Sequence, residues 1–372
     1  MPSTPAGLRR DVPLAGLTTL GVGGSALAFL DVAGPEGVVE ALSWAEEQSL
    51  PVFVLGGGSN LLISDQGWPG LVVRSRDENC SFVPDGSEVV ATVGAGLDWD
   101  FFVSKTVAMG LAGLECLSGI PGFVGGAPIQ NIGAYGQEVS ETIEEVEFVD
   151  RASGRLHTIS GEDCGFSYRQ SRFKGELADL CVVTEVRFRL SSSAPPTLRY
   201  PELARKVAEA QDGEPTLASV REVVLQLRRS KGMVLDPEDP NTRSAGSFFM
   251  NPQLEPDALA ALEAELERRG IAPEGLPRFP ASLGRVKVPA AWLIERAGFT
   301  KGQQLGRAAI SSRHSLALIN SGGATSAEIL ALAGMIRSKV REQFGVTLQP
   351  EARFIGFGSS VDRLLDTGSE KD

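Results

Sequence analysis

Histidine is scarce in this chain of 372 residues, in which His157 and His314 are the only two. A metal centre held by several imidazoles needs more histidines than this, and so does a mechanism built on several of them. We therefore expect no metal site.

Cysteine is also scarce, and its spacing is irregular. Cys80, Cys116, Cys164 and Cys181 form no C-x-x-C pair. Disulfide frameworks and zinc sites are recognised by regular spacing, which is missing here. The sequence predicts reduced, buried, structural thiols.

Long apolar runs are missing as well. Hydrophobic residues make up 42% of the chain, but no run reaches the ~18 residues that a membrane span needs. The first fifteen residues contain Arg9 and Arg10 without an apolar segment after them, so they do not resemble a secretory signal. We expect a cytoplasmic protein that does not bind membranes.

Positive charge is in deficit, with 35 basic against 47 acidic residues and a formal net charge of −12. A negative surface field opposes binding to nucleic acid and to anionic lipid. A small anionic ligand would need a local basic pocket.

One stretch, Gly119–Gly136, has the sequence GIPGFVGGAPIQNIGAYG, with six glycines, two prolines and no charged residue. This composition disfavours both a helix and a regular strand, so it predicts a loop. An uncharged loop needs partners for its backbone N–H and C=O groups, and successive glycine N–H groups can form a nest for a phosphate. A purely structural glycine-rich turn is the alternative.

A second glycine cluster, Gly56–Asn60, follows the apolar run that begins at Pro51. This pattern predicts a strand followed by a loop of the phosphate-binding kind. No Gly-Lys-Ser/Thr follows, which excludes a P-loop, and the next residues, Leu61–Ser64, look extended rather than helical, which excludes a dinucleotide fingerprint.

Together, LGGGSN and GIPGFVGGAPIQNIGAYG resemble the FAD-binding half of the UDP-N-acetylenolpyruvoylglucosamine reductase family. The resemblance implies non-covalent FAD. It also implies an α+β fold, in which a two-lobed FAD-binding region of the vanillyl-alcohol-oxidase (PCMH) type precedes a smaller α+β substrate-binding domain. The implied cofactor-binding residues are Gly56, Gly57, Gly58, Ser59, Asn60, Gly119, Ile120, Pro121, Gly125, Gly126, Ile129, Gln130, Asn131, Gly133 and Ala134.

Hydrophobic periodicity and turn signals predict a hairpin-rich α+β chain. Helices are expected over 35–49, 99–109, 216–230, 257–269 and 325–344, and strand pairs over 70–93 and 143–159. The run SSSAPP, at 191–196, is the strongest boundary signal. The expected ranges are 14–195 for the FAD-binding region (lobes 14–75 and 76–195), 196–230 for a connecting segment with a substrate loop, 231–357 for the substrate-binding domain and 358–372 for a disordered tail.

Reduction of a carbon–carbon double bond requires a hydride donor, a group that stabilises the enolate and a proton donor. Arg169 in YRQS offers a guanidinium fork suited to a carboxylate, Ser247 in SFFMNP offers a hydroxyl, and Glu351 in PEARFIG offers a carboxyl group. Taken singly, these residues also fit a surface arginine, a serine in a strand turn and a strand-end salt bridge. The three motifs resemble the catalytic motifs of the reductase family in their order. The resemblance implies that Arg169 and Glu351 stabilise the enolic intermediate and that Ser247 donates the proton.

The resemblance implies four substrate-binding residues, namely Tyr135, Tyr200, Lys231 and Asn251. Two positions depart from the family pattern: Thr18 stands where the family usually has asparagine, and SSRHSLALIN, at 311–320, lacks the family's glutamine. His314 has no assigned role, and a structural one is expected.

The implied activity is the NADPH-dependent, FAD-mediated reduction of UDP-N-acetylglucosamine enolpyruvate to UDP-N-acetylmuramate, in peptidoglycan precursor synthesis and hence in cell-wall biogenesis, cell shape and cell division. An FAD-dependent alcohol or sugar oxidase of the same superfamily is the alternative. Such oxidases often tether FAD through histidine, whereas no histidine precedes His157 here. A flavin-binding module without turnover is a third reading, but it leaves the catalytic motifs unexplained. We expect a monomer.

Overall fold

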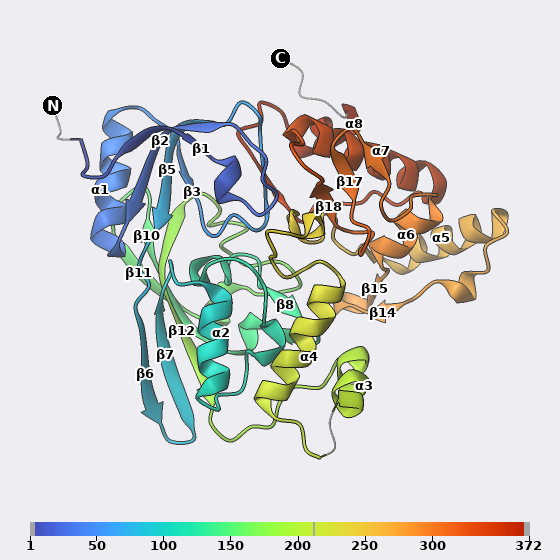
Figure 1. The fold of residues 1–372 in the computed structure, drawn as a ribbon, viewed down its shortest axis with the longest axis horizontal. Helices are drawn as coiled ribbons and strands as arrows, with labels where there is room; N and C mark the ends of the chain where they lie inside the picture. The colour runs from blue at the N-terminus through green and yellow to red at the C-terminus, as the bar shows by residue number, and fades with distance from the viewer. Residues whose placement is uncertain (1–3, 211–212, 368–372) are drawn as a thin grey trace. The chain divides into compact units, whose positions relative to one another are not determined.

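A computed structural model describes residues 4–210 and 213–367 (Figure 1). Contacts between residues group the chain into two compact units. Unit 1 comprises 1–12, 26–58 and 69–234, and unit 2 comprises 13–25, 59–68 and 235–372.

The first sheet of unit 1 has four strands in the order β1-β2-β5-β3, namely Arg9–Pro13, Ser25–Val32, Trp68–Ser75 and Val52–Val54. Helix α1, Gly34–Glu47, lies against this sheet (Figure 1). Val38, Ala41 and Trp44 on the helix share a buried cluster with Ala28 and Leu71 of the strands. The predicted helix over 35–49 is confirmed, and its buried residues recur every three to four positions, as on one face of a helix.

The second sheet of unit 1 is antiparallel, in the order β11-β10-β12-β7-β6. Its strands are Leu156–Ser160, Ile143–Asp150, Cys181–Ser191, Glu88–Gly94 and Cys80–Asp85. The predicted Asp85-Gly86 hairpin is confirmed, because Asp85 pairs with Glu88 across the turn. Helix α2, Trp99–Ala108, packs on this sheet, and its Trp99 and Phe102 rings contact Phe188 at centroid distances of 6.1 and 4.9 Å.

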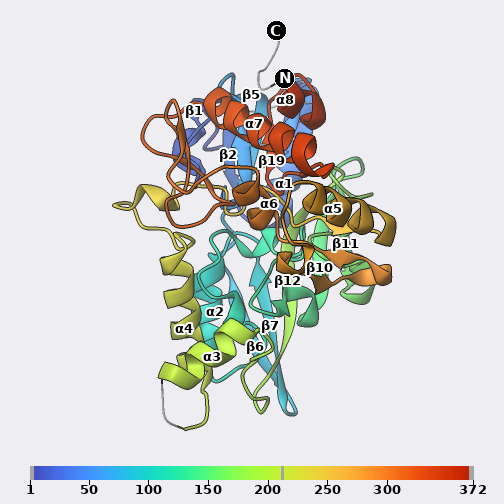
Figure 2. The ribbon, with the colours of Figure 1, turned by 90° about the vertical axis from the view of Figure 1, so that its right-hand side faces the viewer.

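Helices α3, Pro201–Ala210, and α4, Leu217–Ser230, pack against each other in unit 1 (Figure 2). Their apolar faces share a small core in which Leu203, Val220 and Val224 surround Cys116. The side chain of Thr216 caps α4 by accepting a hydrogen bond from the Ser219 N–H. The segment after 196 is therefore an integral part of unit 1.

Unit 2 is built around α7, Ser326–Phe344, whose predicted Thr325 capping box and Gly345 terminus are confirmed. Leu330, Ile336 and Val340 of α7 lie in a core that also contains Leu20 and Leu62 from the two N-terminal segments of this unit. The other helices are α5, Pro256–Arg268, α6, Ala290–Arg296, and α8, Val361–Thr367. The strands of unit 2 are β4, Leu61–Ile63, β13, Gln253–Leu254, β14, Phe279–Pro280, β15, Val286–Lys287, β16, Gln304–Leu305, β17, Ala308–Ile310, β18, Leu318–Asn320, and β19, Arg353–Ile355.

The expectation of a disordered tail over 358–372 is wrong for residues 361–367, which form a helix. Helix α8 buries Leu364 and Leu365 in the core of unit 2, and Arg337 of α7 pairs with Asp362 and Asp366. Two apolar side chains were enough to anchor a segment that its charged, Gly/Ser-rich composition had suggested was unfolded. Residues 368–372 lie outside the described part.

The predicted domain ranges are functional divisions and remain predictions. The compact units divide the chain differently, because 13–25 and 59–68 associate with the C-terminal part and 196–234 with the N-terminal part. Segment 59–68 is held there by Asp65, whose carboxylate accepts hydrogen bonds from the Ser326 and Ala327 N–H groups at 2.8 and 3.0 Å. A carboxylate at a helix N-terminus is favourable because it pairs with the exposed N–H groups and the helix dipole.

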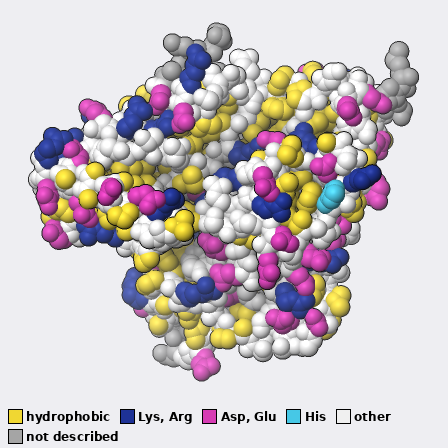
Figure 3. Space-filling model, turned by 180° about the vertical axis from the view of Figure 1, so that it is seen from behind, with side chains coloured by type: hydrophobic (Ala, Val, Ile, Leu, Met, Phe, Trp, Pro, Cys, Tyr) yellow, Lys and Arg dark blue, Asp and Glu magenta, His cyan; other side chains and the backbone are white. Residues whose placement is uncertain are grey.

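Acidic and basic side chains are interspersed over the face shown in Figure 3. In unit 1, for example, Arg189 pairs with Asp85, Glu88 and Glu144.

All four cysteines are free, as predicted, and Cys116 and Cys164 are buried. Between residues 4 and 367, no helix combines the length and the apolar character that crossing a bilayer demands.

Candidate active site

The stretch Gly119–Gly136 is mainly loop, as predicted, with one 3-10 turn at Val124–Gly126 and a two-residue strand, β8, at Gly133–Ala134, which pairs with β9, Gln137–Glu138. Positive φ angles at Gly119 and Gly122, +72° and +137°, explain the need for glycine there. The protein supplies part of the loop's backbone hydrogen bonds itself, since the Val124 N–H donates to Leu97 O at 2.9 Å and the Gly125 N–H to Ala95 O at 3.0 Å.

The two glycine loops meet backbone to backbone inside unit 1. A Cβ placed on Gly57 would lie 2.5 Å from the Gly122 Cα, and one on Gly125 would lie 2.6 Å from the Ala95 Cβ. A Cβ on Gly56 or Gly126, by contrast, would meet no protein atom within 4 Å. The two loops are thus in close contact at Gly57, Gly125 packs against Ala95, and Gly56 and Gly126 face open space, an arrangement that fits a bulky cofactor lying on the open side.

Asn131 fixes the far end of the long loop. It adopts φ +46°, and its side-chain amide donates to Glu138 Oε2 at 2.8 Å and to Ser167 O at 3.1 Å. Its Oδ1 accepts a hydrogen bond from the Ser140 N–H at 3.1 Å. This side chain therefore orders the loop around it, a role that composition alone does not reveal.

Arg169 lies against the same loop. It lies in the tight turn between Ser167 and Gln170 with φ +57°, a left-handed conformation that is uncommon for a residue other than glycine. Its guanidinium donates to Gly133 O at 2.8 Å and to Asn131 O at 3.4 Å. The structure therefore brings the predicted carboxylate-binding arginine to the predicted flavin loop.

Tyr135, Tyr200 and Lys231 form a second group in unit 1. The two rings meet edge to face at 5.5 Å, and Lys231 Nζ lies 5.8 Å from the centre of the Tyr135 ring. Lys231 also pairs with Glu202 at 3.1 Å. Burial raises the pKa of Tyr135 to about 12, so this phenol remains a neutral hydrogen-bond donor at working pH.

The remaining predicted cofactor residues lie along these loops. Ile120, Ile129 and Ala134 pack, partly buried, against the core of the five-stranded sheet, Pro121 and Gln130 are half-buried, and Gly58 adopts φ +68° where unit 1 ends.

Ser247 and Glu351 lie together in unit 2. Ser247 is half-buried after Gly246, whose φ is +75°. The next residue, Phe248, accepts a hydrogen bond on its carbonyl from the Glu351 N–H at 2.8 Å, and Met250 N–H donates to Gln349 O at 2.9 Å. SFFMNP and PEARFIG, which stand about a hundred residues apart in the sequence, are thus neighbouring backbone segments.

Ser59 and Asn60 join this group from the first glycine loop. The Asn60 amide donates to Glu351 O at 3.1 Å, and β4, which follows Asn60, pairs in parallel with β19. Thr19 donates through its hydroxyl to Ser244 O at 2.6 Å, with Ser59 O at 3.4 Å. The threonine at position 18, where the family usually has asparagine, does not affect this contact, because Thr19 makes it.

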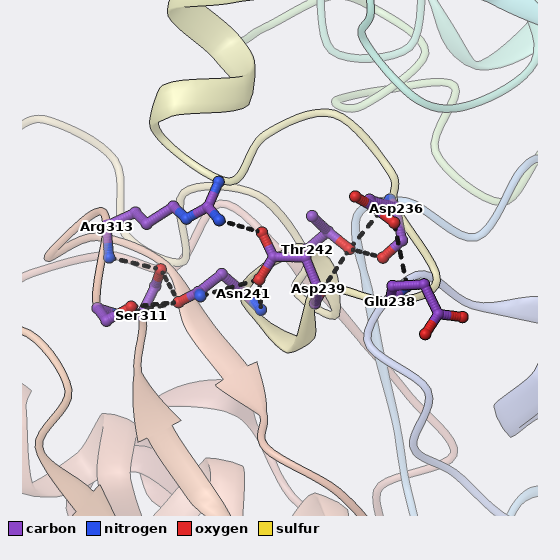
Figure 4. Close-up of polar contacts among 8 residues, drawn as sticks. Asp236, Glu238, Asp239, Asn241, Thr242, Ser311 and Arg313 are labelled. Atoms are coloured by element: carbon purple, nitrogen blue, oxygen red, sulfur yellow. Dashed lines mark hydrogen bonds and ion pairs between the residues drawn. The ribbon is translucent and has the colours of Figure 1, made fainter.

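The loop that leads to Ser247 is fixed by polar contacts that sequence reasoning missed (Figure 4). Asn241 Oδ1 accepts hydrogen bonds from Ser311 Oγ at 2.8 Å and from the Ser312 N–H at 2.9 Å. Asp239 pairs with Arg313 at 2.8 Å, and Thr242 Oγ1 donates to Asp236 O at 2.8 Å. The run DPEDPNT is rich in turn-forming residues, so the sequence predicts a turn there. Nothing in the sequence indicates that this turn contacts residues 311–313.

Asn251 and His314 lie in unit 2 as well. Asn251 Oδ1 accepts a hydrogen bond from the Ala290 N–H at 2.9 Å, at the start of α6, so half of this amide has a structural role. The His314 carbonyl accepts from the Ala317 N–H at 3.1 Å in a turn, and the structural role expected for its imidazole stays a prediction.

Two family models match different parts of the chain. Residues 26–160 match a family model described as FAD binding domain, and 236–355 match one described as UDP-N-acetylenolpyruvoylglucosamine reductase, C-terminal domain. The UDP-N-acetylenolpyruvoylglucosamine reductase of Thermobifida fusca (strain YX) is 49% identical over 352 residues, which cover 93% of this chain and 98% of the relative. That of Streptomyces coelicolor is 49% identical over 351 residues, which cover 93% and 90%.

A crystal structure of UDP-N-acetylenolpyruvylglucosamine reductase from Thermus caldophilus is similar at a TM-score of 0.62 and 28% identity, over 94% of this chain and 98% of the other. The predicted fold class, a FAD-binding region followed by a smaller α+β domain, is confirmed. The match extends through both parts of the chain and favours the reductase over the oxidase alternative. The chain belongs to the UDP-N-acetylenolpyruvoylglucosamine reductase family.

Proposed function

We propose that this protein reduces UDP-N-acetylglucosamine enolpyruvate to UDP-N-acetylmuramate with NADPH as the electron source, in the cytoplasm and as a monomer. The proposal makes it an enzyme of peptidoglycan precursor synthesis, and thus of cell-wall growth, cell shape and division. The observation that supports it most strongly is the hydrogen bond from the Glu351 N–H to the Phe248 carbonyl, because the backbone segments that carry Ser247 and Glu351 are then neighbours within unit 2.

FAD, when bound, supplies hydride transfer to the substrate double bond. The residues that would hold it are the glycines of the two loops, with Gly56 and Gly126 on the open side. Neither loop contains a histidine or a cysteine, so neither offers a side chain of the kind that commonly tethers a flavin. We therefore assign non-covalent binding.

Arg169 is assigned to the carboxylate of the enolpyruvyl group. A guanidinium binds a carboxylate through two parallel hydrogen bonds and keeps its charge at any working pH. Its contacts with Gly133 O and Asn131 O hold it in one orientation before substrate arrives. Negative charge that builds up on this carboxylate as the double bond is reduced is stabilised by Arg169, and Glu351 is assigned to the same intermediate.

Ser247 is assigned the final proton transfer. Hydride addition to one carbon of the double bond leaves negative charge on the other carbon. The Ser247 hydroxyl is assigned to give its proton to that carbon, which forms the second C–H bond. Among the described residues, no side chain hydrogen-bonds to Ser247 Oγ, so its proton is not committed within the protein.

Lys231, the basic residue closest to Ser247 in sequence, belongs to unit 1 and pairs with Glu202. We assign Lys231, Tyr135, Tyr200 and Asn251 to the sugar nucleotide, and we expect neither nucleic acid nor membrane as a partner.

An anaerobic titration tests the proposal. NADPH should bleach the visible absorbance of the purified protein, and the enolpyruvyl substrate should restore it without oxygen. Bleaching that only oxygen reverses would support an oxidase instead, and a chromophore that NADPH does not affect would support a binding module.

A further inference from the structure

Arg228, in the last turn of α4, has a buried Nε atom without a hydrogen-bond partner among the described residues. Its Nη2 donates to Met233 O at 2.9 Å. The residue as a whole is half-buried, and its Nε atom is out of contact with solvent. Burial of a donor without a partner is unfavourable, more so for a charged group, and therefore points to a missing acceptor.

The Nε atom of Arg228 lies near Gly119, at the start of the long glycine loop. A Cβ on Gly119 would come within 3.4 Å of Arg228 Nε, 2.7 Å of the Leu225 side chain and 3.2 Å of Val234. Gly119 is thus packed closely against Arg228 and its neighbours, where a side chain would not fit. This is the loop whose other end, at Asn131 and Gly133, contacts Arg169.

The carboxylate that acts on Arg228, Asp100, is already used. Asp100 Oδ1 accepts hydrogen bonds from Arg221 and from the Gly119 N–H, both at 2.6 Å, and its Oδ2 accepts from Arg221 at 2.8 Å. The charge of Arg169 acts on Arg228 repulsively. Loss of water is the main reason why the pKa of Arg228 is lowered, so the protein keeps this cation at a cost that the described residues do not offset.

We propose that Arg228 is a further cofactor-binding residue, whose Nε donates to an acceptor atom of bound FAD and whose positive charge stabilises the extra negative charge of the reduced cofactor. The inference rests on the proposed FAD binding and deepens it. FAD fits this position better than a freely exchanging anion does, because Arg228 adjoins the glycine loop assigned to the cofactor. A positive charge held near a flavin raises its reduction potential, since it favours the form with more negative charge.

The test compares Arg228→Met and Arg228→Lys with Arg229→Met. Arg229 is the next residue of the same helix, and its exposed guanidinium lies 3.6 Å from Glu222. Two quantities are measured on each purified protein, the dissociation constant for FAD and the midpoint potential of the bound flavin. Arg228→Met should weaken FAD binding about 10- to 100-fold and make the midpoint potential more negative. Arg228→Lys, which keeps the charge but not Nε, should weaken binding while shifting the potential less, and Arg229→Met should match the wild type.

Other outcomes would overturn the assignment. If Arg228→Met left both quantities unchanged and raised only the Michaelis constant for the UDP substrate, the acceptor would belong to that substrate. If it lowered only the melting temperature, Arg228 would be a packing residue. Should Arg228→Met fail to fold, Arg228→Lys carries the test, and unchanged FAD affinity and potential in that variant would contradict the proposal. Wild-type protein that bound no FAD would instead contradict the proposed function itself.

Discussion

The side-chain amide of Asn60 donates a hydrogen bond to the backbone carbonyl of Glu351 at 3.1 Å. Arg353 N–H donates in return to Asn60 O at 2.9 Å, so the end of the first glycine loop and the beginning of β19 are tied together in unit 2. A residue implied in cofactor binding therefore also positions one implied in catalysis.

Asn60→Ala should thus impair more than one function. We expect weaker FAD binding and, at saturating FAD, a lower kcat, because the Glu351 strand loses one hydrogen bond of about 1 kcal/mol. Equilibrium FAD titration and steady-state kinetics at several FAD concentrations measure the two effects. Asn79→Ala is the control, since Asn79 contacts only the exposed side chain of Asp77 among the side-chain contacts described. A kcat fully restored by excess FAD would show that Asn60 acts on the cofactor alone.

Two glycines in the loops should respond in opposite ways. Gly126→Val should fold normally and lose FAD affinity, because a Cβ there meets no protein atom within 4 Å and would enter the space assigned to the cofactor. Gly57→Ala should destabilise the protein itself, because its Cβ would lie 2.5 Å from the Gly122 Cα. Thermal unfolding with and without FAD separates the two. Normal FAD binding by Gly126→Val would place the cofactor elsewhere.

Lys231→Ala should raise the Michaelis constant for the UDP substrate by about tenfold, and that for NADPH as well if both anions use this position. The substitution removes a positive charge and leaves its partner, Glu202, uncompensated. Lys206→Ala, which breaks the exposed pair of Lys206 with Glu209 on α3, is the matched control. If both Michaelis constants stayed at wild-type values, Lys231 would have no place in the substrate site.

Asp100 should contribute to stability in a pH-dependent way. Hydrogen bonds from Arg221 and Gly119, together with the charges of Arg221 and Arg228, outweigh its burial and lower its pKa. A carboxyl group with a pKa lower in the folded than in the unfolded state stabilises the fold above its unfolded pKa, about 3.9, and loses this effect as the pH falls through the folded pKa. Because the Asp100 side chain is 34% exposed, the contribution is about 1 kcal/mol after allowance for screening.

Asp100→Asn should therefore unfold at lower denaturant concentration than the wild type at pH 7, and the difference should shrink below about pH 4. Asp257→Asn, also in the first turn of a helix, controls for the loss of charge near a helix N-terminus. A difference that stayed constant down to pH 3 would show that the Asp100 carboxylate is not the source.

Local signals in the sequence predicted most of the regular structure. The Thr325 capping box, the Gly345 terminus and the Asp85-Gly86 hairpin were readable because each depends on residues within a few positions of one another. The two glycine loops were readable because their composition disfavours both helix and strand, whereas YRQS, SFFMNP and PEARFIG were singled out by their resemblance to motifs of the reductase family.

The sequence did not reveal which segments meet. Thr19 contacts Ser244, 225 positions away, and Asn241 contacts Ser311, and neither pairing has a periodicity or a turn signal. The burial of Arg228 was hidden for the same reason, since an arginine near the end of an amphipathic helix is usually solvated. Such contacts form only in the tertiary fold and leave no local signal in the sequence.

The central claim is that Ser247 donates the proton after hydride transfer, and a two-step measurement on Ser247→Ala tests it most directly. Stopped-flow absorbance under anaerobic conditions follows bleaching by NADPH and then recovery upon addition of the enolpyruvyl substrate. We predict bleaching at close to the wild-type rate and recovery slowed by ~10²–10⁴-fold, with part of the rate regained in Ser247→Cys. Equal slowing of both steps, or of neither, would show that Ser247 is not the proton donor.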